Sequence, residues 1–362
     1  MGKAKVIEAK KTREQQLEVM GEQIDRLITL CVRPRYQWGA TPKLWEAAFK
    51  KAGRPLTLAA AESLMKLKHG DVVAISTGWP IPPVYATGEI CGLAGVASLA
   101  RALAVGLGVR TLFVTEKESI PSMSYVAQKA ELRVWDYDVW DERPNGFAVS
   151  YYDFPKEDEA AKVEAKKLID RFDIKAVICV EKNGVSETGV HCTGLGEDMG
   201  PYTAHVEHLV NEARSRGILT IGMGDVGNEI GFGNIHDEAA EIIKPYGKES
   251  NHGKGGGIID TTIVDHLVVA SASNRACYGV AACLSALLRN PKVLHNKDIQ
   301  TRMMDAARDF PVYDSITVRN TFTEDGSPGE LTLDMFDFMN WFIEAVDWSN
   351  PMFEEARAES GW

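Results

Sequence analysis

Strand-like apolar runs alternate with helical segments along much of this 362-residue chain. The runs lie at residues 71–76, 111–115, 175–181 and 266–271, with a weaker one at 131–139. When helices connect successive strands, the strands pair in parallel through right-handed crossovers and the helices cover the sheet. The sequence therefore predicts an α/β fold, mostly a parallel sheet with helices on both faces, in a Rossmann-like three-layer arrangement.

The stretch from Ile218 to Asn234 is the most unusual of these alternating segments. A short apolar run ends there in a loop with five glycines, and Asp225, Asn228 and Glu229 lie between them. Glycine allows positive φ and close approach of the backbone. The stretch therefore predicts a strand that ends in a tight loop around a ligand, with two carboxylates and an amide at its tip.

A dinucleotide site is an alternative interpretation of this loop, since Gly222, Gly224 and Gly227 match the Gly-x-Gly-x-x-Gly spacing. However, Asp225 lies inside the motif and Glu229 follows it, and both carboxylates would repel a pyrophosphate. The sequence favours carboxylate chemistry over nucleotide binding.

Both ends of the chain have helical character. Residues 5–32 show helical spacing before Pro34, Thr57 is the expected N-cap of a helix to residue 68, and residues 331–346 form an aromatic-rich amphipathic pattern. We expect three parts: a helical N-terminal extension (1–70), an α/β catalytic domain (71–300), and a C-terminal helical extension (301–362) packed on the same unit.

The composition of the chain limits the classes of binding partner and the cellular compartment that we expect. The net charge is −11, which disfavours nucleic acid and anionic membranes because both attract basic surfaces. No apolar run approaches the roughly 20 residues of a membrane span. The six cysteines are scattered without a Cys-x-x-Cys pair, which is typical of reduced cytoplasmic proteins. We expect a cytoplasmic homo-oligomer that binds a small amino acid or dicarboxylate substrate.

Polar clusters follow several of the expected strands, at residues 76–80, 181–184, 225–229 and 271–275. Each cluster alone is typical of turns, which favour Ser, Asn, Asp and Gly. In parallel sheets, however, ligands bind beyond the carboxyl ends of the strands. The common placement of the four clusters therefore indicates one binding crevice.

The sequence Gly-Asp-Val-Gly-Asn-Glu-Ile-Gly-Phe-Gly, beginning at Gly224, resembles the signature of the D-glutamate cyclase family. The resemblance is to its C-terminal catalytic-type domain, which also occurs as a stand-alone bacterial protein. Thr77-Gly-Trp-Pro, Glu181-Lys-Asn-Gly and Ser273-Asn274 are similar to further family segments, so that the resemblance spans about residues 20 to 300. It implies a hydro-lyase that closes D-glutamate to 5-oxo-D-proline and water, or a related lactam-forming or lactam-opening enzyme.

Lactam closure requires a base for the α-ammonium, neutralisation of a carboxylate, and an acid for the leaving oxygen. We expect Asp225 or Glu229 as the base, with Glu181 and Lys182 completing the catalytic set. Lys182, Arg275 and Leu195 lie where the sequence departs from the family pattern, and Lys182 and Arg275 are expected to pair with substrate carboxylates. The expected substrate-binding residues are Thr77, Gly78, Asn183, His191, Gly224, Gly227, Asn228, Ser273, Asn274 and Arg275.

A divalent cation is the one cofactor that the sequence suggests. Asp225, Glu229 and Asp265 offer the oxygen ligands that Mg²⁺ and Mn²⁺ prefer, and such an ion would neutralise a substrate carboxylate. A zinc site is a weaker alternative, because His205, His208 and Glu212 are spaced for one helix face.

Two other functions stay open at the level of sequence. The same fold could act on another amino acid, dicarboxylate or cyclic amide. The altered arginine positions also allow a non-catalytic amino-acid-binding protein. Cys192 beside His191 leaves room for a nucleophilic mechanism, although no Gly-x-Ser-x-Gly elbow is present.

Overall fold

The computed structural model describes residues 12–30, 39–78, 80–143 and 145–347. The expectations for Cys31, Pro34 and Trp79 therefore lie outside the described residues, as do those for residues 5–11 and 348–362. None of the helices within the described ranges combines the length and the apolar character that a membrane crossing requires.

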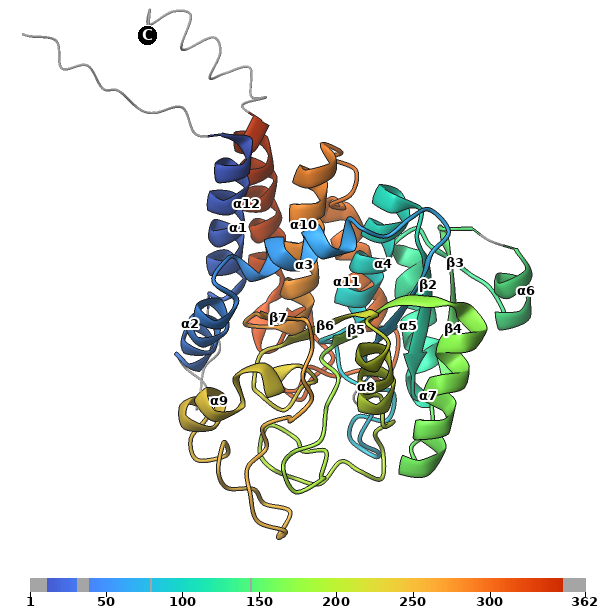
Figure 1. Cartoon of the computed structure of the whole chain (residues 1–362), viewed down its shortest axis with the longest axis vertical. Coiled ribbons are helices and arrows are strands. Elements are labelled where there is room, and N and C mark those ends of the chain that lie inside the picture. The colour runs from blue at the N-terminus through green and yellow to red at the C-terminus, as the bar shows by residue number, and fades with distance from the viewer. Residues whose placement is uncertain (1–11, 31–38, 79, 144, 348–362) are drawn as a thin grey trace, which may run out of the picture.

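A parallel sheet of seven strands forms the centre of the described chain, in the order β3-β4-β2-β1-β5-β6-β7 (Figure 1). The chain leaves β1 toward one edge and returns to β5 on the other side of β1. This reversal of direction is the switch point at which such sheets bind ligands. The strands are β1 (Val72–Ser76), β2 (Arg110–Thr115), β3 (Arg133–Val134), β4 (Ala148–Asp153), β5 (Ile174–Val180), β6 (Leu219–Gly224) and β7 (His266–Val269).

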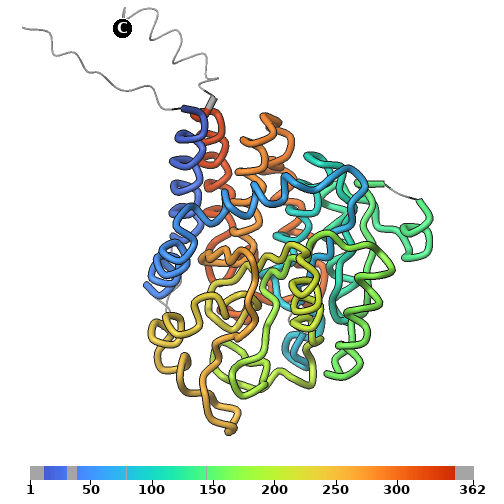
Figure 2. Tube along the Cα trace, in the orientation of Figure 1, coloured from blue at the N-terminus to red at the C-terminus, as the bar shows by residue number. Residues whose placement is uncertain are grey.

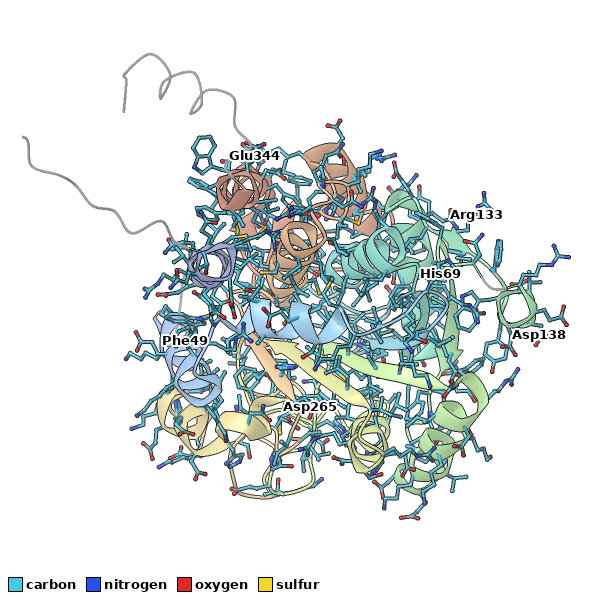
Figure 3. The ribbon with its side chains drawn as sticks, turned by 45° about the horizontal axis from the view of Figure 1, so that its top comes forward. Phe49, His69, Arg133, Asp138, Asp265 and Glu344 are labelled. Carbon is cyan, nitrogen blue, oxygen red and sulfur yellow. The ribbon has the colours of Figure 1, made fainter. Side chains whose placement is uncertain are left out.

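Helices cover both faces of this sheet, which confirms the predicted α/β fold. Figure 3 shows α4 (Leu93–Leu107) and α10 (Ser273–Leu288) on one side, and α7 (Asp158–Phe172) and α8 (Glu207–Ser215) on the other. A second layer of contacts joins α5 (Ile120–Lys129) to α4 and to α11 (Lys297–Ala307).

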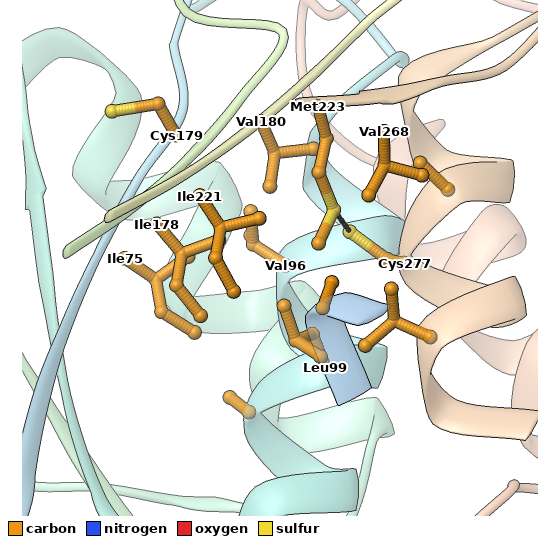
Figure 4. Packing of buried hydrophobic residues seen from close by; sticks show 14 of the residues in the cluster. Ile75, Val96, Leu99, Ile178, Cys179, Val180, Ile221, Met223, Val268 and Cys277 are labelled. Carbon is orange, nitrogen blue, oxygen red and sulfur yellow. Dashed lines mark hydrogen bonds between the residues drawn. The ribbon is translucent and has the colours of Figure 1, made fainter. Parts of the chain in front are cut away.

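The core explains why the central strands are so apolar. Figure 4 shows Ile75, Ile178 and Ile221 on the face that packs against Val96 and Leu99 of α4. The neighbouring Cys179 points to the opposite face, as the pleat of a strand requires. Both faces are buried, so β5 is apolar almost throughout.

The two helical ends pack together. Figure 2 shows α1 (Arg13–Ile28) beside α12 (Gly329–Asp347) at one edge of the molecule, and both contact α10. Thr12 caps α1 through a capping box with Gln15. The division of the chain near residues 70 and 300 stays a prediction.

The expectation that Thr57 caps a helix is wrong. The helix α3 spans Leu56–Leu64 and its N-cap is Pro55, so Thr57 lies inside the first turn. The Thr57 hydroxyl donates instead to the buried carboxylate of Asp25, 2.6 Å away, which also accepts the N–H groups of Leu56 and Thr57. A carboxylate from α1 therefore caps this helix.

The predicted strand at residues 131–139 is also wrong in extent. Only the two-residue strand β3 forms there, and α6 (Tyr137–Glu142) begins before residue 139. The strand β4, which the sequence pattern did not reveal, lies between β3 and β2, and its Tyr151 stacks on Phe113 at 5.4 Å. The remaining elements are α2 (Ala40–Ala52), α9 (His236–Ile242), the hairpin β8 (Thr323–Glu324) and β9 (Ser327–Pro328), and the short 3-10 helices η1 (Lys117–Ser119) and η2 (Phe232–Ile235).

Candidate active site

Four side chains from distant parts of the chain converge beyond the carboxyl ends of β5 and β6. Potential ligand atoms of Cys91, Glu181, Asp225 and Asp325 all lie within 4.8 Å of one another, and all four residues are buried. The hydroxyl of Ser273 and the thiol of Cys91 both donate to Glu181 Oε2, at 2.5 and 3.4 Å. We call Cys91, Glu181, Asp225 and Asp325 the acidic cluster.

Glu181 is held in an unusual backbone conformation. Its φ is 52°, which lies in the left-handed region that residues other than glycine rarely adopt. Its N–H donates to the carbonyl of Met223 in the next strand. Such strain persists where the surrounding structure enforces it, often at functional sites. Here it accompanies the turn that follows β5 and leads into Lys182.

Glu89 is a further buried carboxyl group beside the acidic cluster, and the sequence reasoning did not identify it. Burial, reinforced by the charge of Glu181, raises the pKa of Glu89 well above its usual range. Burial together with Asp325 and Glu181 likewise raises the pKa of the Cys91 thiol. The surroundings of Glu89 therefore favour its protonated form, and Cys91 is a thiol and not a thiolate nucleophile at neutral pH.

The glycine-rich loop after β6 wraps around its own glutamate. The carboxylate of Glu229 accepts hydrogen bonds from the N–H groups of Asp225, Val226 and Gly227, at 2.8 to 3.0 Å. A Cβ on Gly224 would lie 2.9 Å from the side chain of Glu229, so a glycine is required at that position. The loop N–H groups are directed at Glu229, which leaves Asp225 as the loop carboxylate within the acidic cluster.

Lys182 forms a fully buried ion pair with Glu116, which follows β2. Glu116 also accepts the N–H of Ala204 at 2.6 Å. A Cβ on Gly78, where φ is 127°, would lie only 2.5 Å from Glu116 Oε2. Gly78 and Lys182, both predicted site residues, thus lie next to Glu116. Glu116 was not predicted as a site residue, although it directly follows a strand.

Arg275 lies in the first turn of α10 and is almost completely buried. Its Nη1 donates to Ser271 Oγ at 2.8 Å, and its Nε lies 3.5 Å from Glu324 Oε2. Glu324 also accepts hydrogen bonds from Asn274, Tyr278 and Thr332. The structure therefore places Arg275 against a carboxylate of the β8–β9 hairpin.

Asn274 joins two elements of the site. Its Oδ1 accepts the N–H groups of Gly92 and Gly95 at 2.8 and 2.7 Å. These N–H groups belong to the start of α4, where the backbone would otherwise lack acceptors. Asn274 thereby fixes the segment that carries Glu89 and Cys91.

Three other predicted residues present buried polar atoms to the site. Asn183 and Asn228 both donate Nδ2 to the carbonyl of Cys192, each at 2.8 Å. Among the described residues, Asn183 Oδ1, Asn228 Oδ1 and Thr77 Oγ1 are buried without a hydrogen-bond partner. Buried polar atoms are rarely left so, and these three atoms are suited to contact a polar ligand.

His191 and Asp265 lie apart from the acidic cluster. His191 Nε2 is 3.2 Å from Glu207 Oε2, near the start of α8. Asp265 accepts the N–H and hydroxyl of Thr220 at the opposite end of β6, five residues and roughly 16 Å of strand from Asp225. The structure therefore does not bring the predicted metal ligands Asp225, Glu229 and Asp265 together. Asp265 lies at the amino ends of the strands, and the carboxylate of Glu229 accepts the loop N–H groups.

The acidic cluster supplies a different set of donors for a cation. The carboxylates of Glu181, Asp225 and Asp325 converge with a thiol, and carboxylate oxygens are the ligands that Mg²⁺ and Mn²⁺ prefer. Asp325 comes from the segment between β8 and β9, which the sequence assigned to a packing extension. These residues fit a divalent cation by the chemistry of their donors.

The protein is thus a doubly wound α/β protein with buried carboxylates at the switch point of its sheet. The family described as D-glutamate cyclase-like, C-terminal, matches residues 39–339. The chain therefore belongs to the D-glutamate cyclase-like family, which confirms the resemblance seen in the sequence. Membership supports a cyclase or a related lyase at the level of the family. No curated protein matches the chain.

Proposed function

We propose that this protein converts D-glutamate to 5-oxo-D-proline and water, or catalyses a closely related lactam-forming or lactam-opening reaction. The observation that carries the proposal is the acidic cluster at the switch point, in a chain of the D-glutamate cyclase-like family. Buried carboxylates suit an ammonium substrate, which brings the positive charge that they lack.

Asp225 is the proposed base. It lies in the acidic cluster, whereas the carboxylate of Glu229 accepts three loop N–H groups. Asp225 takes a proton from the α-ammonium, and the free amine then attacks the γ-carboxyl carbon of the same molecule. The site holds the two ends close together, which supplies much of the rate advantage.

Glu89 is the proposed acid for the leaving oxygen, because it lies buried beside the acidic cluster and its pKa is raised, which favours the protonated form that an acid must have. Closure forms one C–N bond and breaks one C–O bond. The nitrogen loses two protons in all, and both leave with a γ-carboxyl oxygen as water. Thr77, Asn183 and Asn228 present buried polar atoms that would orient the substrate.

The proposed cofactor is a divalent cation, Mg²⁺ or Mn²⁺, held by Glu181 and Asp325, so that Asp225 stays available as the base. When bound, such an ion supplies positive charge that neutralises a substrate carboxylate. Lys182 pairs with Glu116, and Arg275 Nε lies 3.5 Å from Glu324 Oε2, whereas Arg275 Nη2 is buried without a hydrogen-bond partner among the described residues. An ion would therefore provide positive charge that Lys182, in its buried pair, does not offer to the substrate.

The proposed compartment is the cytoplasm, and the proposed assembly is a homo-oligomer. The free cysteines Cys91, Cys179, Cys192, Cys277 and Cys283 are all buried, as is common in reduced proteins. On α12, Phe338 and Trp341 are 56% and 41% exposed, which supports a contact with another copy.

The substrate is tested by incubating the purified protein with D-glutamate, L-glutamate and each enantiomer of 5-oxoproline. Parallel samples contain Mn²⁺, Mg²⁺ or a chelator, and chiral chromatography follows interconversion. Interconversion of the D pair, lost on chelation, supports the proposed reaction and its cation. Failure of the D pair under every condition contradicts the proposed reaction.

A second candidate is an amino-acid-binding protein without turnover, or an enzyme for another amino acid, dicarboxylate or cyclic amide. The engagement of Lys182 and Arg275 by internal carboxylates favours it, because a dicarboxylate would then be held differently from the family pattern. Calorimetric binding of D-glutamate without chemical change would identify the binding protein. Turnover of the L pair would identify a different substrate.

A further inference from the structure

A second group of potential ligands lies at the starts of α7 and α8, outside the acidic cluster. Side-chain atoms of Asp158, His205, Glu207 and His208 all lie within 4.8 Å of one another. We call these four residues the histidine cluster. Asp158 and Glu207 are the first residues of α7 and α8, and the His205 N–H donates to the carbonyl of Pro155. This backbone contact holds the two helix starts together.

The distances between the ligand atoms lie on either side of the spacing in a tetrahedral zinc site. Zinc bonds of about 2.0–2.1 Å place neighbouring ligand atoms roughly 3.3 Å apart. In the histidine cluster, His205 Nδ1 is 2.7 Å from Glu207 Oε1 and 3.8 Å from Asp158 Oδ1. His208 Nε2 is 2.6 Å from Asp158 Oδ1 and 4.0 Å from Glu207 Oε1. Two of these distances are shorter than the required spacing and two are longer, so small side-chain movements would place all four ligand atoms around an ion.

The acidic ligands also lie where a helix favours negative charge. Asp158 and Glu207 begin α7 and α8, and carboxylates are stabilised at helix N-termini. One oxygen of Asp158 and one oxygen of Glu207 are directed at the imidazoles of His208 and His205. Two carboxylates in this position supply the negative charge that a 2+ ion requires.

Outer contacts orient two of the ligands, as is usual in metal sites. The second oxygen of Glu207 is 3.2 Å from His191 Nε2, and the second oxygen of Asp158 accepts from Lys162 Nζ at 2.5 Å. Both carboxylates are thereby fixed by one oxygen while the other faces the two histidines.

We propose that Asp158, His205, Glu207 and His208 bind one zinc ion, or a transition-metal ion of similar preference, at a site distinct from the acidic cluster. Imidazole nitrogens with carboxylates suit Zn²⁺ better than Mg²⁺. Glu212, which helical spacing suggested as a ligand, is not part of this site because it pairs with Arg216 at 2.7 Å. The proposal does not depend on the reaction proposed above.

The test uses full-length protein stripped with a chelator and dialysed. Zinc is titrated by calorimetry with a competing chelator, and metal content is measured by mass spectrometry. We expect one ion at the histidine cluster, with affinity reduced by about a hundredfold in His208→Ala and in Asp158→Asn. The matched control is Glu212→Gln, on the same helix, which should bind zinc as the wild type does. Circular dichroism confirms that each variant is folded.

Cobalt distinguishes the two clusters, because Cys91 belongs to the acidic cluster and the histidine cluster contains no thiol. Cobalt at the histidine cluster should give visible d–d bands that persist in Cys91→Ser and disappear in His208→Ala. No zinc binding, or binding that His208→Ala leaves unchanged, would overturn the proposal. Loss of both the d–d bands and a thiolate-to-cobalt charge-transfer band in Cys91→Ser would also overturn it, because the cobalt would then be bound at the acidic cluster.

Discussion

Lys182 donates a hydrogen bond to Glu116, and both side chains are 0% exposed. Removing one partner of a buried ion pair leaves the other charge uncompensated, so Glu116→Gln should reduce the free energy of unfolding by about 3–5 kcal/mol. Denaturant unfolding measures this loss. In the double variant Glu116→Gln/Lys182→Met no buried charge remains, so it should be more stable than Glu116→Gln alone. Equal losses in the single and double variants would contradict the ion pair.

Asn274 is expected to stabilise the start of α4 from outside that helix. In Asn274→Ala the N–H groups of Gly92 and Gly95 lose their acceptor, at a cost of about 1–3 kcal/mol for each buried group. The control is Asn296→Ala, which removes an exposed cap from α11 and should cost only about 1 kcal/mol. Thermal unfolding of both variants provides the comparison, and similar losses would show that Asn274 has no special role.

His295 should make stability depend on pH. Burial lowers its pKa to about 4, from an ordinary value near 6.5. The unfolded chain therefore binds a proton first as pH falls, so this contribution to stability is present above about pH 6.5 and is lost toward pH 4. Between pH 7 and pH 5 the wild type should lose about 2 kcal/mol more than His295→Asn. Parallel pH dependences in urea unfolding would contradict this prediction.

Phe336 should be an anchor of α12. Its side chain is fully buried, with ring centroids 5.2 and 4.8 Å from those of Tyr278 and His295. Phe336→Ala should cost about 3–5 kcal/mol. Phe338→Ala, on the same helix but 56% exposed, should change stability by less than about 0.5 kcal/mol in the monomer. Chemical unfolding at low protein concentration tests the pair, and equal effects would contradict the packing of α12.

The sequence predicted the central strands well because their physical signal is local. The strands β1 and β5 are buried on both faces and are therefore apolar almost without interruption. The strand β4 carries Ser150 and Asp153 and lies near the sheet edge, so its pattern is weaker. The hairpin that supplies Glu324 and Asp325 has strands of two residues each, which leave no periodic signal.

The position of the candidate site could be predicted from the sequence, but the partners of its charged side chains could not. The strand-end rule brought Glu181 and Asp225 together correctly, because parallel strands end at one edge. Sequence cannot show that Lys182 and Arg275 face Glu116 and Glu324, since these partners are 66 and 49 residues away and meet only in the folded chain. For the same reason Asp325 was not identified.

In the proposed reaction Asp225 acts as the base, while Glu229 holds the glycine-rich loop. The most direct test is the rate of D-glutamate cyclisation by Asp225→Asn, with wild type and Glu229→Gln measured beside it and unfolding followed for all three. We expect Asp225→Asn to lose about 10²–10⁴ in kcat while remaining folded. Glu229→Gln should lose stability by about 1–3 kcal/mol, because its amide cannot accept all three loop N–H groups. Turnover by Asp225→Asn at the wild-type rate would contradict the account.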